Sequence, residues 1–447
     1  MNFNKETIDK FISNSFEIDC FDICLTQKTD KDPIIYTGPG TIYQDEHGIL
    51  QLKLYSKLND MHKELSYQSK NDTPGKIIAK DDKFTLKATD MFGNEWVADN
   101  IWISDSTPCS TEDLVIKTKL DEIKNIKSNE IQSNFKKNSL FIIVPGQYKI
   151  PCNEKEDLPN GGRRLNRTVF SANEIDFEFR KLDSCLTINA NSKTEKLDKD
   201  TYIKLIEALS IFTGFIVRPV VIRNTQKDIN ILKIKSVNNS FANKELPFSF
   251  KHSAPTNLKS FTCFLEKYLV NIKAPFSDLF GYWLKINRAW QAGIMNFSLS
   301  LSVAIEGIVK SYFRERGLPD KEIFQQAEKA KQKIKDMDLG KKIKKRILNS
   351  IGDLLKNTSP KLALYQMTEN NLLNKAMVDE WVKLRNKLVH PVKMNQDPIA
   401  IQKYIDRIDT CLALFYSLLF IIIKYEGSYM DYSEKEWPGK KFKLKNE

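Results

Sequence analysis

The sequence predicts an α+β protein in which a mostly β N-terminal region is followed by an all-α helical bundle. Short apolar runs that alternate with polar residues dominate up to about residue 252. Beyond that point, apolar residues recur at helical spacing to the end of the 447-residue chain. With 41% hydrophobic residues, the chain can bury a sizeable core. We therefore expect two regions, 1–252, which has room for two subdomains, and 253–447.

The N-terminal region carries the alternation that is typical of half-buried strands. Between Ile49 and Tyr55, the leucines at every second position face one side, and Gln51 and Lys53 face the other. Similar short runs are separated by Asn, Asp, Gly and Pro, and these strand candidates lie at 84–87, 96–104, 140–144, 176–180 and 186–190. The pattern predicts a mostly antiparallel sheet.

One helix interrupts these strands, from about Thr201 to Phe212, and Gly214 is well placed to end it. A strand-like run at 216–223 follows. The segment 159–164 is a predicted loop with two arginines that can touch phosphate, although a Gly-rich turn with solvated charges is the simpler explanation. It lacks the Gly-Lys-Ser/Thr of a P-loop.

From about Thr256, apolar residues mark the buried faces of helices. The first two faces consist of Phe261, Leu265 and Leu269, and then of Leu301, Ile305, Ile308, Val309 and Tyr312. Further helices are expected at about 319–336, 340–356, 371–389 and 397–425, with breaks at Pro319, Gly340, Pro360 and Pro391. This spacing predicts a compact helical bundle.

The longest apolar stretch, Cys411–Ile423, falls short of the roughly 20 residues that a membrane helix needs. We expect a buried helix there and no membrane association. The first residues show no secretory signal, and the seven cysteines make a poor disulfide framework, so we expect a cytoplasmic protein. Cys20 and Cys24 have no second pair at ligand spacing, and we expect no metal site and no cofactor.

The net charge of +12 belongs entirely to the C-terminal region. Residues 1–252 hold 36 basic and 36 acidic side chains, whereas residues 253–447 hold 33 and 21. Nine of the basic residues lie in the lysine-rich stretch 329–346. A concentrated positive charge indicates a polyanion partner, and a solvated lysine face is the alternative.

Of the four histidines, at 47, 62, 252 and 390, only His390 lies in the helical region. It follows Arg385 by five positions, on a helix whose apolar stripe comprises Met377, Trp381, Leu384 and Leu388. A plain helix would separate Arg385 and His390 by about 140°. Pro391 disfavours helical geometry at His390, so the imidazole can turn toward the groove that the guanidinium reaches. A histidine that caps the helix beside a solvated arginine is the alternative.

The segment Arg385-Asn-Lys-Leu-Val-His390 resembles the Arg-x(4 to 6)-His signature of HEPN domains, with its frequent polar residue after the arginine. The stretch 300–313, which contains Ala304-Ile-Glu306, is similar to an early helix of the ApeA-like HEPN group. The tail at 425–432, Tyr-Glu-Gly-Ser-Tyr-Met-Asp-Tyr, is similar to that group's C-terminal stretch. Together these resemblances cover about residues 295–440.

The N-terminal half resembles more loosely the β-rich region that precedes HEPN domains in such antiphage proteins. The resemblance rests on Gly38-Pro-Gly40 before Gly48-Ile-Leu-Gln-Leu, and on Leu209-Ser-Ile-Phe-Thr-Gly214. By this resemblance, the neutral N-terminal half is a sensor or gate, with a phage-derived activator as its candidate ligand.

The resemblance implies metal-independent RNA cleavage, in which the ribose 2′-hydroxyl attacks its own phosphate and leaves a 2′,3′-cyclic phosphate and a 5′-hydroxyl. His390 would exchange protons, and Arg385 would bind the phosphate oxygens as negative charge develops. Asn386 would orient the phosphate or the partner histidine. Because one histidine cannot easily serve as acid and base in the same step, a homodimer is expected.

Three further residues are candidates for supporting roles. Glu306 stands beside a buried stripe, where it either supports the site or pairs with a lysine on a neighbouring helix. Lys383 and Lys387 flank the arginine and are candidate RNA contacts. The lysine-rich stretch 329–346 either contacts RNA or forms a solvated lysine face.

These features predict an antiphage ribonuclease of abortive infection, with RNA as its substrate and tRNA as one candidate class. The alternative is a catalytically silent HEPN domain that serves as a nucleic-acid-binding or protein-interaction scaffold. A third interpretation is a nuclease whose inhibited dimer must first be released by a phage component.

Overall fold

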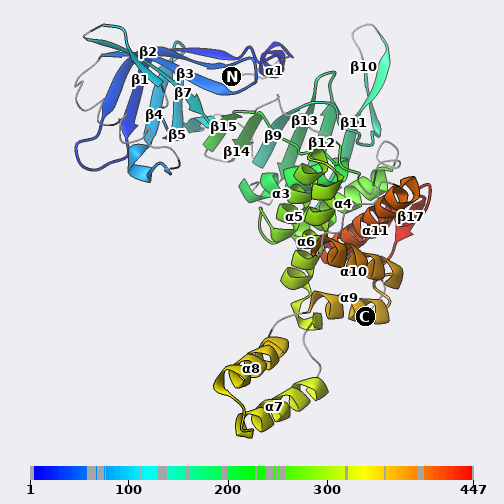
Figure 1. The fold of residues 1–447 in the computed structure, drawn as a ribbon. Coiled ribbons are helices and arrows are strands. Elements are labelled where there is room, and N and C mark those ends of the chain that lie inside the picture. The colour runs from blue at the N-terminus through cyan, green and yellow to red at the C-terminus, as the bar shows by residue number, and fades with distance from the viewer. Residues whose placement is uncertain are drawn as a thin grey trace. The chain divides into compact units, whose positions relative to one another are not determined.

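The computed structural model describes residues 5–57, 67, 75, 77–103, 105–110, 112–128, 138–157, 161–192, 197, 199–226, 229–237, 245–247, 250, 257–317, 321–356, 359–389 and 397–444. The chain forms two compact units (Figure 1). The sheet unit comprises residues 1–202 and 217–243, and the helical unit comprises residues 203–216 and 244–447. The expected boundary at residue 252 lies outside the described residues.

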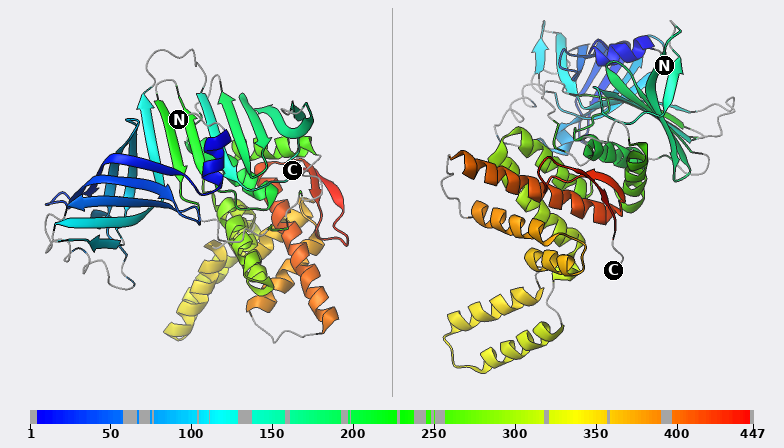
Figure 2. Two further views of the ribbon diagram at one scale, coloured as in Figure 1. Left: turned by 90° about the horizontal axis from the view of Figure 1, so that it is seen from above. Right: turned by 90° about the vertical axis from the view of Figure 1, so that its right-hand side faces the viewer.

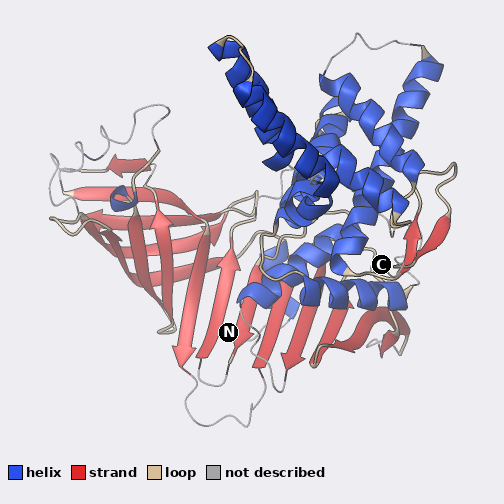
Figure 3. Cartoon of the chain, turned by 90° about the horizontal axis from the view of Figure 1, so that it is seen from below, coloured by secondary structure: helices blue, strands red, loops and turns tan. Residues whose placement is uncertain are grey.

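The described strands of the sheet unit form one antiparallel sheet in the order β10-β11-β12-β13-β9-β14-β15-β8-β5-β4-β1-β2-β3-β7-β6 (Figure 3). Their bounds are β1 Glu17–Gln27, β2 Ile35–Gln44, β3 Leu50–Lys57, β4 Phe84–Asp90, β5 Glu95–Ile101, β6 Asp105–Pro108, β7 Asp113–Leu120, β8 Glu122–Ser128, β9 Asn138–Pro145, β10 Glu154–Asp157, β11 Arg163–Ala172, β12 Ile175–Lys181, β13 Cys185–Ser192, β14 Val221–Thr225 and β15 Ile229–Lys235. The helix α1 (Lys5–Ile12) precedes them, and the short helix η1 (Lys80–Asp82) precedes β4.

Side-chain alternation places the core of the sheet unit where the sequence predicts it. Leu50, Leu52 and Leu54 of β3 are fully buried, while the residues between them are half-buried or exposed. On the neighbouring strand, a Cβ at Gly40 would collide with the Lys53 carbonyl, so this glycine allows β2 to lie close to β3.

The sheet narrows at one junction. Strand β8 pairs with β5 through two residue pairs, Trp96 with Asn125 and Val97 with Lys124. The neighbouring pairings are longer, since β15 matches β8 over seven residues. The junction therefore joins two broader parts of the sheet.

The predicted loop at 159–164 is shorter than expected, because strand β11 already begins at Arg163. Arg163 begins β11 and pairs with Asp157 at 3.0 Å, and Arg164 pairs with Asp183 at 2.6 Å. Residues 159 and 160 lie outside the described part of the chain. Both arginines therefore have carboxylate partners within their own unit.

The helical unit contains most of the helices. Helix α3 (Lys199–Thr213) belongs to the sheet unit up to Tyr202 and to the helical unit from Ile203 onward, and Gly214 follows it at a φ of 74°. The other elements are α4 Leu258–Asn271, α5 Asp278–Gln291, α6 Ile294–Tyr312, η2 Arg314–Gly317, α7 Lys321–Asp336, α8 Lys341–Lys356, α9 Pro360–Glu369, α10 Lys375–Val389 and α11 Pro398–Ile423. In Figure 2, the yellow helices α7 and α8 lie side by side.

The expectation of an all-α C-terminal region is wrong. The helical unit also contains a hairpin of two antiparallel strands, β16 (Gly427–Met430) and β17 (Gly439–Phe442). Strands of four residues are too short to show a clear alternation in sequence. The hairpin is tied together by Asp431, which accepts hydrogen bonds from Ser433 and Lys440. The C-terminal region is therefore helical with a small sheet.

Helix α11 forms the centre of the helical unit. Every residue from Cys411 to Phe420 is buried, because neighbouring elements cover the helix on all sides. The Phe420 ring lies 4.8 Å from that of Tyr425 and 5.8 Å from that of Phe250, centroid to centroid. Packing within the unit thus accounts for the longest apolar run. No helix in the described residues is long and apolar enough to span a bilayer.

Helix α9 lies where the sequence predicts only a break at Pro360. The Ser359 hydroxyl accepts a hydrogen bond from the backbone N–H of Leu362, and Pro360 occupies the first turn. Proline is favoured at that position because the first helical N–H groups have no intrahelical partner. Here the proline begins a helix.

The turn between β4 and β5 yields a stability prediction. Asp90 is 4% exposed and accepts hydrogen bonds from the backbone N–H groups of Phe92 and Asn94 and from Nε1 of Trp96. Burial alone would raise the pKa of Asp90, but these hydrogen bonds outweigh it and hold the pKa below its ordinary value. We expect Asp90→Asn to lower the free energy of unfolding by about 2 kcal/mol at neutral pH.

Because the pKa of Asp90 is depressed in the folded chain, its contribution is complete above the ordinary aspartate pKa of about 3.9 and is lost as the pH falls below it. Urea unfolding at neutral and acid pH measures the difference between wild type and variant. The exposed Asp22 provides the control Asp22→Asn, which should change stability little. A deficit in Asp90→Asn that persists undiminished in acid would contradict this role for the carboxylate.

Candidate functional site

Helices α6 and α10 pack in a register that brings Glu306 to Arg385. Nε1 of the buried Trp381 donates a hydrogen bond to the Ser302 carbonyl at 3.3 Å. One turn further along each helix, Nε of Arg385 lies 2.8 Å from Oε2 of Glu306. The two contacts are four residues apart on both helices and in the same chain direction, so one register accounts for both.

Glu306 accepts hydrogen bonds from two cations. Besides Arg385, Lys310 on the next turn of α6 donates from Nζ to Oε1 at 2.7 Å. The Glu306 side chain is 23% exposed and that of Arg385 is 43% exposed. Burial raises the pKa of Glu306, but the hydrogen bonds from Lys310 and Arg385 and their positive charges outweigh it, and the pKa lies below its ordinary value. The carboxylate is therefore ionised at neutral pH.

The ion pair engages one side of the guanidinium. Arg385 donates to Glu306 through Nε, and among the described residues no hydrogen bond involves Nη1 or Nη2. The terminal nitrogens of an arginine form the fork that binds two oxygens of a carboxylate or phosphate. The arrangement fixes the side chain while its anion-binding end stays available.

The stripe of α10 supports this geometry. Met377, Trp381 and Leu384 are buried, as the sequence predicts. The side chain of Leu388 lies outside the described residues. Arg385 flanks the stripe, half-buried, and Asn386 is exposed. The position of Arg385 at the edge of the buried face therefore follows from the apolar pattern of α10.

His390 lies outside the described residues, as does the segment 390–396, which includes Pro391. The last residue of α10 is Val389. The convergence of His390 and Arg385 stays a prediction from the sequence.

Lys383 and Lys387 lie on another face of α10. Lys383 pairs with Glu380 at 2.6 Å, and Nζ of Lys387 lies 4.8 Å from the ring centroid of Tyr404 on α11. Both lysines are two residues from Arg385, which corresponds to about 160° around a helix. The structure therefore joins Arg385 to Glu306 and directs these two lysines elsewhere.

An exposed apolar stripe precedes Glu306 on α6. Met295, Leu299 and Val303 recur every four residues and are 51%, 49% and 56% exposed. We call these three residues the α6 stripe. It lies apart from the buried face of the same helix, which includes Leu301, Ile305 and Ile308. The only sequence signal for this stripe is that the apolar residues of α6 recur at two distinct helical phases, and the expected buried face accounts for one of them.

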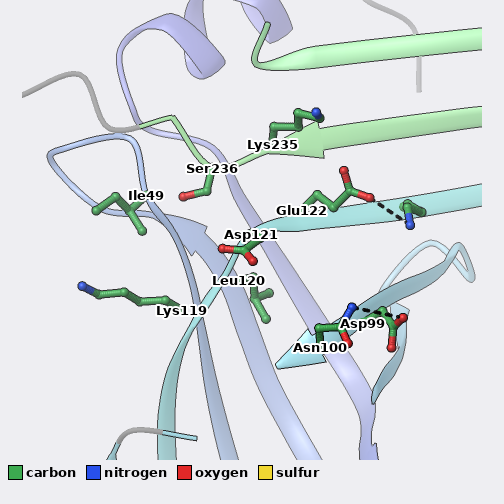
Figure 4. A pocket seen from close by; sticks show the side chains of 10 residues that line it. Ile49, Asp99, Asn100, Lys119, Leu120, Asp121, Glu122, Lys235 and Ser236 are labelled. Atoms are coloured by element: carbon green, nitrogen blue, oxygen red, sulfur yellow. Dashed lines mark hydrogen bonds and ion pairs between the residues drawn. The ribbon is translucent and has the colours of Figure 1, made fainter. Parts of the chain in front are cut away.

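The sheet unit contains a polar pocket of about 560 Å³ beside its narrow junction (Figure 4). Asp121 and Ser236 lie toward the middle of its lining, with Lys119 and Lys235 farther out. Lys124 pairs with Glu122 at 2.9 Å, and Asp99 pairs with Lys28 at 2.5 Å. The lining combines both signs of charge and is mainly polar.

Metal-ligating side chains do not cluster in the part of the chain that the structure describes. Cys20 and Cys24 both lie on β1, and burial raises the pKa of Cys20 to about 12, together with the charges of Asp90 and Asp19. A thiol with that pKa is protonated at neutral pH and is a poor nucleophile.

Comparisons of the chain with known protein families, with curated proteins and with solved structures found no match in any of the three. The chemistry of the site therefore has to be argued from its own residues.

The site yields a second stability prediction. Arg385→Ala should lower the free energy of unfolding by less than about 1 kcal/mol at neutral pH, because partly exposed ion pairs contribute little. The depressed pKa of Glu306 means that this small contribution is complete above the ordinary glutamate pKa of about 4.3 and disappears in acid. Trp381→Ala, one turn earlier and fully buried, should cost about 3–5 kcal/mol.

Urea unfolding of both variants tests this difference. A loss for Arg385→Ala as large as that for Trp381→Ala would assign the arginine to the architecture of the unit and not to a site.

Proposed function

We propose that the chain is an HEPN-like endoribonuclease of antiphage defence that cuts RNA without a metal, with Arg385 and His390 as its catalytic pair. The observation that supports it most is the guanidinium of Arg385, which Glu306 holds through Nε while Nη1 and Nη2 have no hydrogen-bond partner among the described residues. A positioned arginine with an available fork suits a phosphate whose charge increases during a reaction.

The reaction begins when a base removes the proton from the ribose 2′-hydroxyl. The 2′-oxygen then bonds to the adjacent phosphorus, and the bond from phosphorus to the 5′-oxygen breaks. The leaving oxygen takes up a proton, which gives a 2′,3′-cyclic phosphate and a 5′-hydroxyl. A histidine, whose ordinary pKa is about 6.5, can donate or accept these protons at neutral pH, and we assign that role to His390.

Arg385 and its neighbours stabilise the phosphate in this scheme. The guanidinium binds the non-bridging oxygens, where negative charge builds up in the transition state. Glu306 is a positioning residue, because it contacts the arginine and not the substrate. Asn386, exposed next to Arg385, would orient the phosphate or a second histidine through its amide.

We infer that two copies of the chain form one active site, since one histidine cannot easily act as acid and base together. The α6 stripe supports this inference, because three exposed apolar side chains lead directly to Glu306. A stable interface buries about 800 Å² on each partner, and such a stripe can form its apolar centre. A two-fold axis near its end would bring both copies of Arg385 and His390 to one cleft.

The sheet unit then acts as a sensor. Residues 1–252 carry no net charge, and the polar pocket beside the narrow junction gives a ligand a place to bind. We propose that a phage-derived activator binds the sheet unit in the cytoplasm and releases the nuclease, which then acts in abortive infection. Cellular RNA, with tRNA as one candidate, would be the substrate.

A silent scaffold is the competing function, and one observation favours it. Glu306 already compensates the charge of Arg385 and would compete with a phosphate for it. In a scaffold, the ion pair only joins α6 to α10, and the helical unit holds nucleic acid or a protein without cutting.

Cleavage by the purified chain separates the two functions. We expect wild type to cut total RNA in EDTA and to leave cyclic phosphate ends, with a phage lysate added as a source of activator. Arg385→Ala and His390→Ala should each lower cleavage at least about a hundredfold and abolish phage protection, because each removes a group that acts in the transition state. The exposed Arg288 of α5 provides the control Arg288→Ala, which should cut normally.

Glu306→Gln tests positioning. It should lower kcat about tenfold to a hundredfold with little change in KM, because the amide holds Arg385 less firmly in its reactive geometry. An unchanged kcat would leave Glu306 as a purely structural partner. If no variant differs from wild type, or if wild type cuts nothing with lysate present, the scaffold is the correct function.

The dimer has its own test. Leu299→Asp with Val303→Asp should convert the chain from dimer to monomer in light scattering, because each aspartate places a charge in the apolar centre of the interface. Ile399→Asp changes an exposed apolar residue at the start of α11 and should leave the dimer intact. A dimer that survives the double substitution would place the interface elsewhere.

A further inference from the structure

Helices α7 and α8, which we call the basic hairpin, carry half of the net charge of the chain. Residues 321–356 hold eleven Lys and Arg against five Asp and Glu, a net charge of +6 out of +12. This segment lies between η2 and α9, and none of its described charged side chains pairs with Arg385 or Glu306. The positive charge of the C-terminal region is therefore concentrated outside the candidate active site.

Part of the apolar surface of the two neighbouring helices is covered. On α8, Ile347, Leu348 and Ile351 are half-buried and Leu355 is buried, and α7 contributes the half-buried Ala330 and Ile334. On a helical wheel of α8, Lys342 and Arg346 lie opposite these residues, Lys345 lies to one side, and Lys341 lies beside Leu348. All four of these cations are exposed, and Lys342, Lys345 and Arg346 point away from the apolar face of α8.

Most of the described cations of this hairpin have no ion-pair or hydrogen-bond partner. Lys331 pairs with Glu328, and Lys344 donates to the Met337 carbonyl. Within the described chain, seven others are exposed and take part in no ion pair or hydrogen bond: Lys329, Lys333, Lys335, Lys341, Lys342, Lys345 and Arg346. By contrast, both basic side chains at the Glu306 site have a carboxylate partner. Unpaired positive charges repel one another, and a polyanion relieves that repulsion.

The spacing suits a phosphate backbone. Lys329 and Lys333, Lys341 and Lys345, and Lys342 and Arg346 are each four residues apart, which places them about 6 Å apart along the helix. Consecutive phosphates of a nucleic-acid strand are separated by a similar distance. Phe324, 46% exposed at the start of α7, can stack on a base. Ile323, Met337 and Ile343 are also 45%, 55% and 59% exposed, so binding of the cations to an anionic membrane surface is the alternative outcome of the test.

We propose that the basic hairpin is a polynucleotide-binding arm that contacts the phosphate backbone of single-stranded RNA without reading its sequence. The choice of RNA over DNA rests on the proposed ribonuclease function. The binding of phosphate groups by the cations does not depend on that function. The arm would capture RNA through the charges of α7 and α8 and raise its concentration near Arg385, so that binding and cleavage use different parts of the helical unit.

The test measures binding in the full chain with Arg385→Ala, so that cleavage does not interfere. The probe is a fluorescent single-stranded RNA of about 20 nucleotides, slightly longer than the largest site of a single binding module. Replacing Lys341, Lys342, Lys345 and Arg346 by Gln should raise Kd at least about tenfold at moderate salt, and the plot of log K against log salt should flatten by up to about 3. Glutamine has a helix propensity close to that of lysine, so the fold should persist.

The matched control replaces three exposed lysines and one exposed arginine elsewhere in the helical unit, namely Lys259, Arg288, Lys403 and Lys435. It removes the same charge and should change Kd less than about threefold, since charges away from the binding surface act through screened solvent. If circular dichroism shows that the α8 variant is unfolded, a second variant on α7 repeats the test. It replaces Lys329, Lys333 and Lys335 by Gln. Single-stranded DNA of the same length should bind similarly.

The proposal is overturned if the hairpin variants and the control weaken binding equally, or if the parent chain binds no RNA. It is also overturned if the hairpin variants lose binding to phosphatidylserine vesicles while they keep binding to RNA, since the arm would then serve a membrane. A failure of cleavage by the wild-type chain would refute the ribonuclease but would not change these Kd values.

Discussion

The register of α10 on α6 is the constraint on which the candidate site depends. Trp381 is buried and its indole N–H reaches the Ser302 carbonyl, so the two helices cannot slide along each other without losing both packing and a hydrogen bond. One turn later the same register sets Glu306 against Arg385 at 2.8 Å. The charged pair contributes little to stability by itself, and it acquires its geometry from the apolar contact beside it.

The helical unit holds its positive charges in two different states. At the site, Arg385 and Lys310 share one ionised carboxylate, so the arginine is fixed and its charge is partly compensated. In the basic hairpin, seven cations have no partner among the described residues and lie on exposed helix faces. Fixed cations suit transition-state stabilisation, which needs defined geometry, whereas free cations suit capture of a polyanion, which needs charge. The helical unit can thus bind a polyanion at the basic hairpin and carry out chemistry at Arg385.

Much of the fold could be predicted from sequence where a pattern repeats often enough. The alternation at 50–54 predicts β3, and the stripe of Met377, Trp381 and Leu384 predicts the buried face of α10. Short or capped elements could not be predicted in this way. The four-residue strands β16 and β17 contain no full repeat, and they make the all-α expectation wrong. Pro360 predicts a break, but the Ser359 hydroxyl before it caps a helix that begins there.

The site itself could be predicted only in part. Arg385 and Glu306 are 79 residues apart, and no local pattern states that they meet; their pairing follows from the packing of two helices. The sequence predicts for Glu306 either a site role or a lysine partner on a neighbouring helix; the structure pairs it with Arg385 on a neighbouring helix and with Lys310 on its own helix. Lys383 and Lys387 are near Arg385 in sequence but contact Glu380 and Tyr404, because two residues along a helix nearly reverse the direction of a side chain.

We propose that the ribose 2′-hydroxyl is the nucleophile, activated at a site that contains Arg385 and His390. The most direct measurement uses an RNA with one deoxyribose at a mapped cut site, incubated with the full chain and phage lysate in EDTA. If the 2′-hydroxyl is the nucleophile, cutting at that position stops, while cutting of the all-ribose RNA continues and leaves a cyclic phosphate. Unchanged cutting of the deoxy substrate would contradict it, because water or another nucleophile would then attack the phosphorus.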